Sequence, residues 1–201
     1  MSKPETRSTE ATVPGVFSFY VRVVHWLAIV GGVLATLCLI ILTFLVFSEV
    51  ILAAWTKLFP GSHADIPVAW EYSGYLMGAA FMLGSSITMR AGGHVRVTAL
   101  IGMLPPKVRH AVECFTTAIG MLFSGFLSYA LLMAAYRSFL DGNVSFASYT
   151  PLWIPQTAIA VGALFLTLAL IERLIRCFLG LELEIHGLKV VSASDLDITK
   201  D

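Results

Sequence analysis

The chain has 201 residues, of which 57% are hydrophobic and only 13% are charged, and its mean hydropathy is +0.82. This composition excludes an ordinary soluble domain and indicates a protein of the lipid bilayer. Because 13 Lys and Arg balance 13 Asp and Glu, there is no net basic field to hold nucleic acid. We therefore expect no nucleic-acid partner.

Four long stretches of the chain carry no charge, and each is long enough to cross a bilayer once as a helix. At about 1.5 Å per residue, they match a hydrocarbon core about 30 Å thick. Backbone groups in lipid must be hydrogen-bonded within the segment, which favours helices. We predict an all-α integral membrane protein with four transmembrane helices, at residues 27–47, 72–89, 114–136 and 152–171.

Lys and Arg fall unevenly on the two sides of these spans. Lys57 and Arg137 lie on one side, and the other eleven of the 13 lie with the two termini and the middle connection. Under the positive-inside rule, this distribution predicts that both termini and the middle connection face the cytoplasm.

The segments outside the spans define three parts of the chain. Residues 1–15 are expected to be a flexible N-terminus, residues 16–180 the membrane domain and residues 181–201 a cytoplasmic tail. Within the membrane domain, residues 16–26 carry apolar side chains at helical spacing and predict a separate N-terminal interfacial helix. We expect no cleaved signal peptide, because the first apolar run is longer than a signal core.

The most distinctive sequence lies between the second and third spans. Gly92 and Gly93 follow Arg90 and are expected to end the second helix, since glycine readily adopts a left-handed cap. A short interfacial helix is predicted from His94 to Leu104, and two prolines stop it and start the next helix. The charged side chains of this connection, including Arg96, are expected to contact lipid headgroups or a partner protein.

Small residues recur in the second and third spans and predict close contact between helices. Lipid offers no hydrophobic driving force between helices, so close approach of their backbones supplies much of the attraction. We favour packing inside this subunit, and packing against a second membrane protein stays open. The residues concerned are Gly74, Gly78, Gly84, Gly120 and Ser124.

No group of residues in the sequence indicates a catalytic centre, a metal site or a cofactor. The five histidines lie at helix ends or in connections, so no facing pair within the spans is available to ligate haem. The three cysteines are odd in number, and we expect them to be small apolar fillers with no disulfide framework. They are Cys38, Cys114 and Cys177.

Acidic and amide side chains lie near the ends of the spans, whereas ion-coupled transporters place them at mid-depth. A Na⁺ or H⁺ site made by this chain alone is therefore not expected. Glu113 is expected at the start of the third helix, either paired with a nearby arginine or solvated at the helix N-terminus. Glu172 and Arg176 are four residues apart and predict an exposed ion pair. The remaining residues of this kind are Glu49, Glu71 and Gln156.

One set of features is specific enough to suggest a family. Glu71 and Tyr72 open the second helix, the stretch GAAFMLGSS follows, and the motif RAGGHVRV from Arg90 precedes the two prolines. Together they resemble the small membrane subunit of tripartite ATP-independent periplasmic (TRAP) transporters over about residues 20 to 180. Thr98 stands where the family often has an acidic residue, so no ion pair is assigned there.

The resemblance implies a sodium-coupled importer of three parts in the cytoplasmic membrane of a bacterium or archaeon, the inner membrane if Gram-negative. A periplasmic binding protein delivers a small organic acid to the large membrane subunit, which carries the moving elevator and the sodium sites. The small subunit would brace the large one, contact membrane lipids and help to dock the binding protein. Expected contact residues are Arg90, Gly92, Gly93, His94, Arg96, Glu71 and Glu113.

Two other functions stay open on the sequence. A membrane-anchor or electron-transfer subunit of a redox complex also uses four helices and cytoplasmic histidines, and a Soret band would identify it. A self-sufficient small transporter would move substrate when reconstituted alone. We expect that the chain is not an enzyme and carries no cofactor.

Overall fold

The computed structural model describes residues 15–59, 66, 68–91 and 105–179. Four long helices form nearly all of this part, which confirms the predicted all-α class: α1 (Gly15–Leu58), α2 (Ala69–Arg90), α4 (Pro106–Leu140) and α5 (Trp153–Phe178). Several expectations lie outside the described residues. They concern the flexible N-terminus, the glycine cap at Gly92 and Gly93, the interfacial helix with His94 and Arg96, and the C-terminal tail.

Three of the helices are long and apolar enough to cross a membrane, namely the stretches Phe17–Leu58, His110–Leu140 and Trp153–Phe178. Helix α2 is not among these candidate spans because it is less hydrophobic. Glycine, serine and tyrosine take the place of larger apolar side chains along much of its length. A long helix at each of the four predicted spans is confirmed. By length and composition, three helices are candidate spans.

Helix α1 is continuous over 44 residues, which corresponds to about 66 Å at 1.5 Å per residue. The prediction of a separate interfacial helix at residues 16–26 is therefore wrong, since this segment is the first part of α1. No proline lies between Gly15 and Leu58, and a helix continues where nothing removes its hydrogen bonds. At this length, α1 is about twice as long as a hydrocarbon core is thick.

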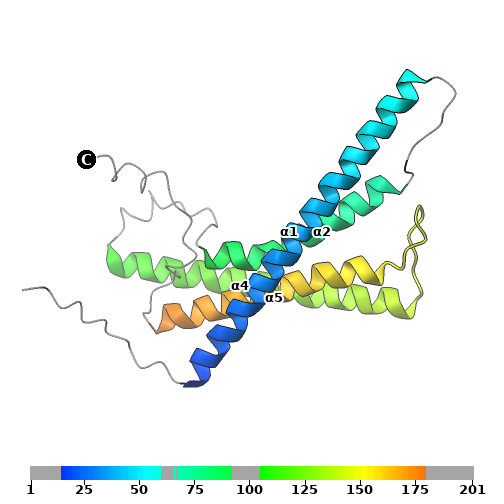
Figure 1. Ribbon diagram of the computed structural model, residues 1–201. Helices are drawn as coiled ribbons and strands as arrows, with labels where there is room; N and C mark the ends of the chain where they lie inside the picture. The colour runs from blue at the N-terminus through cyan, green and yellow to red at the C-terminus, as the bar shows by residue number, and fades with distance from the viewer. Residues whose placement is uncertain (1–14, 60–65, 67, 92–104, 180–201) are drawn as a thin grey trace, which may run out of the picture.

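The helices pack in the order α4, α5, α2 and α1, and α1 also contacts α5. Figure 1 shows α4 and α5 side by side, while α1 crosses the other helices diagonally and its C-terminal part projects beyond them. Helices α2 and α5 are thus central, and α1 and α4 form the two flanks. The large exposed apolar side chains are concentrated on these flanks, including Phe44 and Phe47 of α1 and Phe123 and Phe126 of α4.

The two prolines start α4 as predicted, with Pro105 before the helix and Pro106 in its first turn. The helix begins eight residues before the predicted span at residue 114, because a transmembrane helix continues past the lipid wherever its sequence allows. Helix α2 ends at Arg90, also as predicted, and the following Ala91 keeps right-handed backbone angles.

The closest approach between helices occurs where α1, α2 and α5 meet. A Cβ atom on Gly162 would lie 2.6 Å from the backbone nitrogen of Leu83, and one on Gly31 would lie 2.7 Å from the carbonyl oxygen of Leu83. Only glycine permits such distances. This contact lies beside a buried cluster formed by Ala35, Ala79 and Leu83, so small side chains set the distance between the central helices.

Most of the small residues singled out from the sequence also face another helix of this chain. A Cβ on Gly78 would meet Ile159 at 3.2 Å, and one on Gly84 would meet Ala35 at 3.4 Å. Gly120 faces Leu170 at 3.8 Å, and Ser124 accepts a hydrogen bond from Thr167 at 3.3 Å. Only Gly74, among the five, has nothing described within 4 Å. Packing inside the subunit is thus the role of the other four.

Candidate functional site

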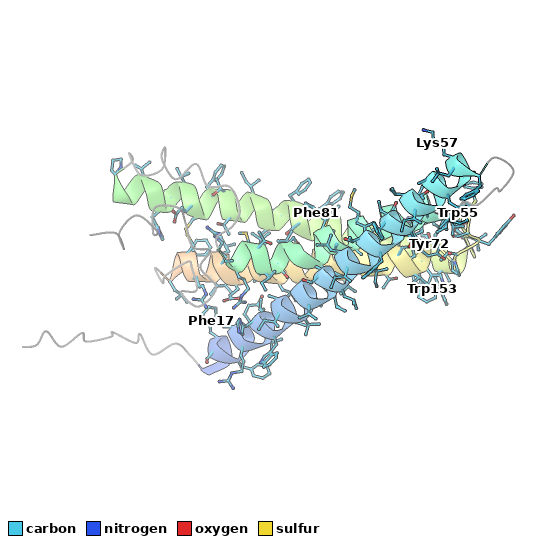
Figure 2. The ribbon with its side chains drawn as sticks, turned by 45° about the horizontal axis from the view of Figure 1, so that its top comes forward. Phe17, Trp55, Lys57, Tyr72, Phe81 and Trp153 are labelled. Atoms are coloured by element: carbon cyan, nitrogen blue, oxygen red, sulfur yellow. A yellow bond between two sulfur atoms is a disulfide. The ribbon has the colours of Figure 1, made fainter. Side chains whose placement is uncertain are left out.

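Polar side chains gather at the two ends of the helix bundle and leave an apolar middle. One end holds the last turn of α2 and the end of α5, and the other holds the first turn of α2 and the connection between α4 and α5. Figure 2 places Trp55, Tyr72 and Trp153 together at the second end, with Phe17 at the far end of α1. Aromatic side chains at the end of a membrane-spanning bundle are typical of the membrane–water interface.

The first end contains a buried ion pair between the two central helices. Arg90 is the last residue of α2 and Glu172 lies near the end of α5; their side chains are each only 4% exposed. Arg90 Nη1 pairs with Glu172 Oε2, and Arg176 Nε donates to Glu172 Oε1 at 2.9 Å. One carboxylate thus binds two guanidinium groups, an arrangement that we call the charged corner (Arg90, Glu172, Arg176).

The charged corner corrects two expectations from the sequence. Glu172 and Arg176 do pair, but the pair is not at the surface, because Arg90 from α2 covers the carboxylate. Arg90 itself lies inside the bundle and does not extend toward lipid headgroups. No sequence pattern indicates this contact, since 82 residues separate Arg90 from Glu172 and only the packing of α2 on α5 brings them together.

Two further contacts join the helices around the charged corner. Tyr20 of α1 donates a hydrogen bond from its hydroxyl to the carbonyl oxygen of Leu168 on α5, at 2.9 Å. Arg173 Nη1 of α5 lies 3.9 Å from the sulfur of Met89 on α2. Three helices are therefore connected through polar atoms at this end of the bundle.

At the opposite end, Glu71 lies in the first turn of α2, as predicted. Its side chain is buried, and the hydroxyl of Tyr75 donates to its Oε1 at 2.5 Å. Its second oxygen has no hydrogen-bond partner among the described residues. Neighbouring Tyr72 exchanges a hydrogen bond of 2.7 Å with Thr150, so the start of α2 holds the connection that leads into α5.

The connection between α4 and α5 is an ordered turn rather than a loose loop. Val144 and Pro151 form an antiparallel bridge, and the backbone N–H of Ser145 donates to the carbonyl of Thr150 at 2.9 Å. Tyr149 has a φ of 53°, which is unusual for a residue other than glycine. The rings of Phe146 and Tyr149 are both exposed.

Glu113 does not lie where the sequence placed it. It follows Pro106 by seven residues inside α4, so the helix N-terminus is well before it and a solvated N-terminal carboxylate is the wrong interpretation. The helix begins early because Pro106 has backbone angles that suit the first turn. Glu113 therefore lies within α4, directly before Cys114.

Cys114 and Cys177 form a disulfide between α4 and α5, with their Cα atoms 5.8 Å apart. The expectation of three cysteine fillers without a disulfide is therefore wrong for these two. The cysteines are 63 residues apart, and only the packing of the start of α4 on the end of α5 brings them together. Cys38 is a free thiol that packs against the buried alanine and leucine cluster, as predicted.

Among the described residues, the middle of the bundle contains packed side chains and no charged group that could bind an ion. Several hydroxyl groups bond to their own helix, as Thr88 does to the carbonyl of Gly84 at 3.0 Å and Ser86 to that of Leu83 at 3.4 Å, and Thr167 of α5 also donates to Ser124 of α4. No charged side chain lies in the central part of α2, α4 or α5. Glu49 lies within α1, nine residues before its end. Within this part, nothing resembles the mid-depth ion sites of transporters.

Comparison with known proteins gives one match. Residues 42–180 match the family model described as tripartite ATP-independent periplasmic transporters, DctQ component. No curated protein and no solved structure matches the chain. The matched range contains all of α2, α4 and α5 and the last part of α1, and it favours the first of the three functions considered from the sequence. The chain therefore belongs to the DctQ family of TRAP transporter components, and it is a membrane subunit for transport and not an enzyme.

Proposed function

We propose that this protein anchors the large membrane subunit of a sodium-coupled TRAP importer for small organic acids. The observation that carries the proposal is the contrast between an interior closed by packing and two flanks of large exposed apolar side chains. The described parts of α2, α4 and α5 hold no charged side chain at mid-depth, so we assign ion and substrate binding to the large subunit. The contribution of this protein is then mechanical, through contacts with lipid and with a partner.

The mechanical role follows from how an elevator works. A moving domain carries substrate across the membrane only if the scaffold beside it stays still. Helices added to that scaffold enlarge its area in the bilayer and make it harder to tilt. The long, oblique α1 and the flank formed by α4 are suited to this role, because each presents apolar surface along most of its length.

The contact with the large subunit is proposed to lie along the outer face of α1 and α2. An open apolar groove runs between these helices, and it is lined by Ile29, Gly32, Val33, Leu37, Ile40 and Ile87. Gly32 makes room for Ile87 of α2, since a Cβ there would lie 3.1 Å from the Ile87 Cδ1. The large apolar side chains beside this contact, such as Val33 and Leu37, stay exposed and are proposed to pack against a helix of the large subunit.

The orientation proposed is that of the positive-inside rule, with both termini in the cytoplasm. The charged corner then faces the cytoplasm, and the connection between α4 and α5 faces the periplasm. Phe146 and Tyr149 are exposed on that connection, and its own backbone bonds hold them in place. We place the docking of the periplasmic binding protein there.

The decisive experiment is transport by reconstituted membranes. The large subunit is purified with and without this protein and placed in liposomes with the binding protein, a sodium gradient and a labelled small organic acid. Uptake is expected only when both membrane subunits are present. Equal uptake by the large subunit alone would refute the anchoring role, and uptake by this protein alone would show that it is itself a transporter.

Cross-linking tests the proposed contact. In a Cys38→Ser background, Leu37→Cys in the groove and Phe123→Cys on α4 are both exposed positions on opposite flanks. A short cross-linker is expected to join the large subunit to the first and not to the second. Cross-links only at residue 123 would move the contact to the α4 flank.

A further inference from the structure

The ends of α4 and α5 bring together three side chains that ligate metals. Cys114 and Cys177 lie face to face across the two helices, and His110 lies one turn before Cys114 on α4. His110 Nε2 is 3.7 Å from Cys114 Sγ. The three potential ligand atoms all lie within 4.8 Å of one another.

We propose that, in the reduced protein, His110, Cys114 and Cys177 bind one Zn²⁺ ion that holds α4 against α5. The disulfide is then the oxidised, metal-free form of the same connection. This proposal goes beyond transport and anchoring, because it concerns a metal site in the small subunit itself.

The chemistry of the three ligands favours zinc. Two thiolates and an imidazole are the donors that Zn²⁺ most often takes in proteins. In the proposed orientation these helix ends face the cytoplasm, where cysteine pairs are kept reduced. A cysteine pair in that compartment more often binds a metal or performs redox chemistry than forms a lasting disulfide.

The geometry needs only a small rearrangement. With Zn–S bonds of about 2.3 Å and Zn–N bonds of about 2.0 Å, ligand atoms at tetrahedral angles are about 3.5 to 3.8 Å apart. The distance of 3.7 Å between His110 Nε2 and Cys114 Sγ already satisfies this condition. The two sulfur atoms need to separate after the disulfide is cleaved, and rotation about the Cα–Cβ bonds achieves this without moving the helices.

The burial of the ligands leaves one coordination position open. Cys177 is only 1% exposed, Cys114 is half-buried and His110 is exposed. The ion would thus be covered on the side of Cys177 and open on the side of His110. Three protein ligands with water in the fourth position complete the tetrahedral coordination of zinc.

The exchange between the two forms balances. A cellular dithiol transfers two electrons and two protons to the disulfide, which becomes two thiols while the dithiol becomes a disulfide. Zn²⁺ then replaces the two thiol protons, which are released to water. In the reverse direction a cellular disulfide accepts two electrons from the two thiolates and two protons from water, which gives a dithiol, the Cys114–Cys177 disulfide and the released Zn²⁺.

Metal binding to the full-length protein without a histidine tag tests the proposal. The protein is treated with a phosphine reductant, equilibrated with Zn²⁺, passed over a desalting column and assayed for zinc by mass spectrometry. One Zn²⁺ per chain is expected for the reduced protein and none for the oxidised protein. When Co²⁺ replaces Zn²⁺, the reduced wild-type protein is expected to show the charge-transfer absorption of thiolate-bound cobalt. This measurement needs no variant.

Variants identify the ligands. Cys114→Ser and Cys177→Ser are expected to lose stoichiometric binding, and His110→Ala to bind at least about tenfold more weakly. Cys38→Ser is the matched control and is expected to bind like wild type, since Cys38 lies apart from the cluster. Equal zinc binding by wild type and Cys114→Ser, or no thiolate absorption with Co²⁺ in the reduced wild type, would overturn the proposal. Such a result would overturn the zinc site and would leave the proposed anchoring role in transport untouched.

Discussion

Removing the carboxylate of the charged corner is expected to destabilise the protein strongly. In Glu172→Leu, Arg90 keeps its charge in a place where its side chain is only 4% exposed. Two charges about 4 Å apart interact by about 4 kcal/mol at an effective dielectric constant of 20. Removing one partner of a buried ion pair typically costs about 3 to 5 kcal/mol. We expect a loss of that size in the free energy of unfolding.

The double variant separates the interaction from the cost of an unpaired charge. In Arg90→Met with Glu172→Leu, no buried charge is left without its partner at this position, and apolar replacement of a buried pair is often neutral. Arg176 is 19% exposed at its side chain, so solvent can reach it. The double variant is therefore expected to recover at least about 2 kcal/mol relative to the sum of the single variants.

The assay is reversible unfolding of the purified protein in mixed micelles, followed by two spectroscopic probes so that two-state behaviour can be checked. Arg137→Gln is the control, because Arg137 is exposed on α4 and its loss is expected to change stability by less than about 0.5 kcal/mol. A cost below about 1 kcal/mol for Glu172→Leu, the range of an exposed pair, would refute the argument that burial makes this pair strong.

Three further results are expected. Gly162→Ala should cost about 1 to 3 kcal/mol through overpacking, whereas Gly74→Ala, with nothing described within 4 Å, should be neutral; equal effects in unfolding assays would contradict the close helix contact. Glu71→Gln should leave the sodium dependence of uptake unchanged, because this carboxylate lies at a helix end; an altered sodium stoichiometry would place the subunit in the ion pathway. Reporter fusions at Asp141 and Asp201 should be exported and cytoplasmic respectively, and the reverse pattern would invert the topology.

The sequence alone determined the all-α class of this protein and the four long helices of its described part. Long uncharged stretches have no stable form in lipid except a helix, so composition and the positions of charge were sufficient. Two prolines predicted the start of α4, because proline suits the first turn of a helix and cannot continue a preceding one. The motif that includes Arg90 and the glycines after it also led to the family.

Helix ends were less predictable. A hydropathy pattern marks where a helix lies in lipid and not where its hydrogen bonds stop. Helix α1 therefore begins at Gly15 and α4 at Pro106, well outside the apolar stretches. The interfacial helix at residues 16–26 is predicted from apolar side chains at helical spacing, but the backbone of α1 continues through this segment without a break.

Only the tertiary structure decided which side chains meet. The sequence showed Glu172 and Arg176 as neighbours on one helix, but Arg90, which buries them, is 82 residues away from Glu172. The same holds for Cys114 and Cys177, whose separation of 63 residues made each look like an isolated apolar filler. Contacts between helices depend on how close the backbones approach and at what angle. Here a single glycine at position 162, set against the backbone of Leu83, lets α5 pack closely enough on α2 for Arg90 and Glu172 to meet.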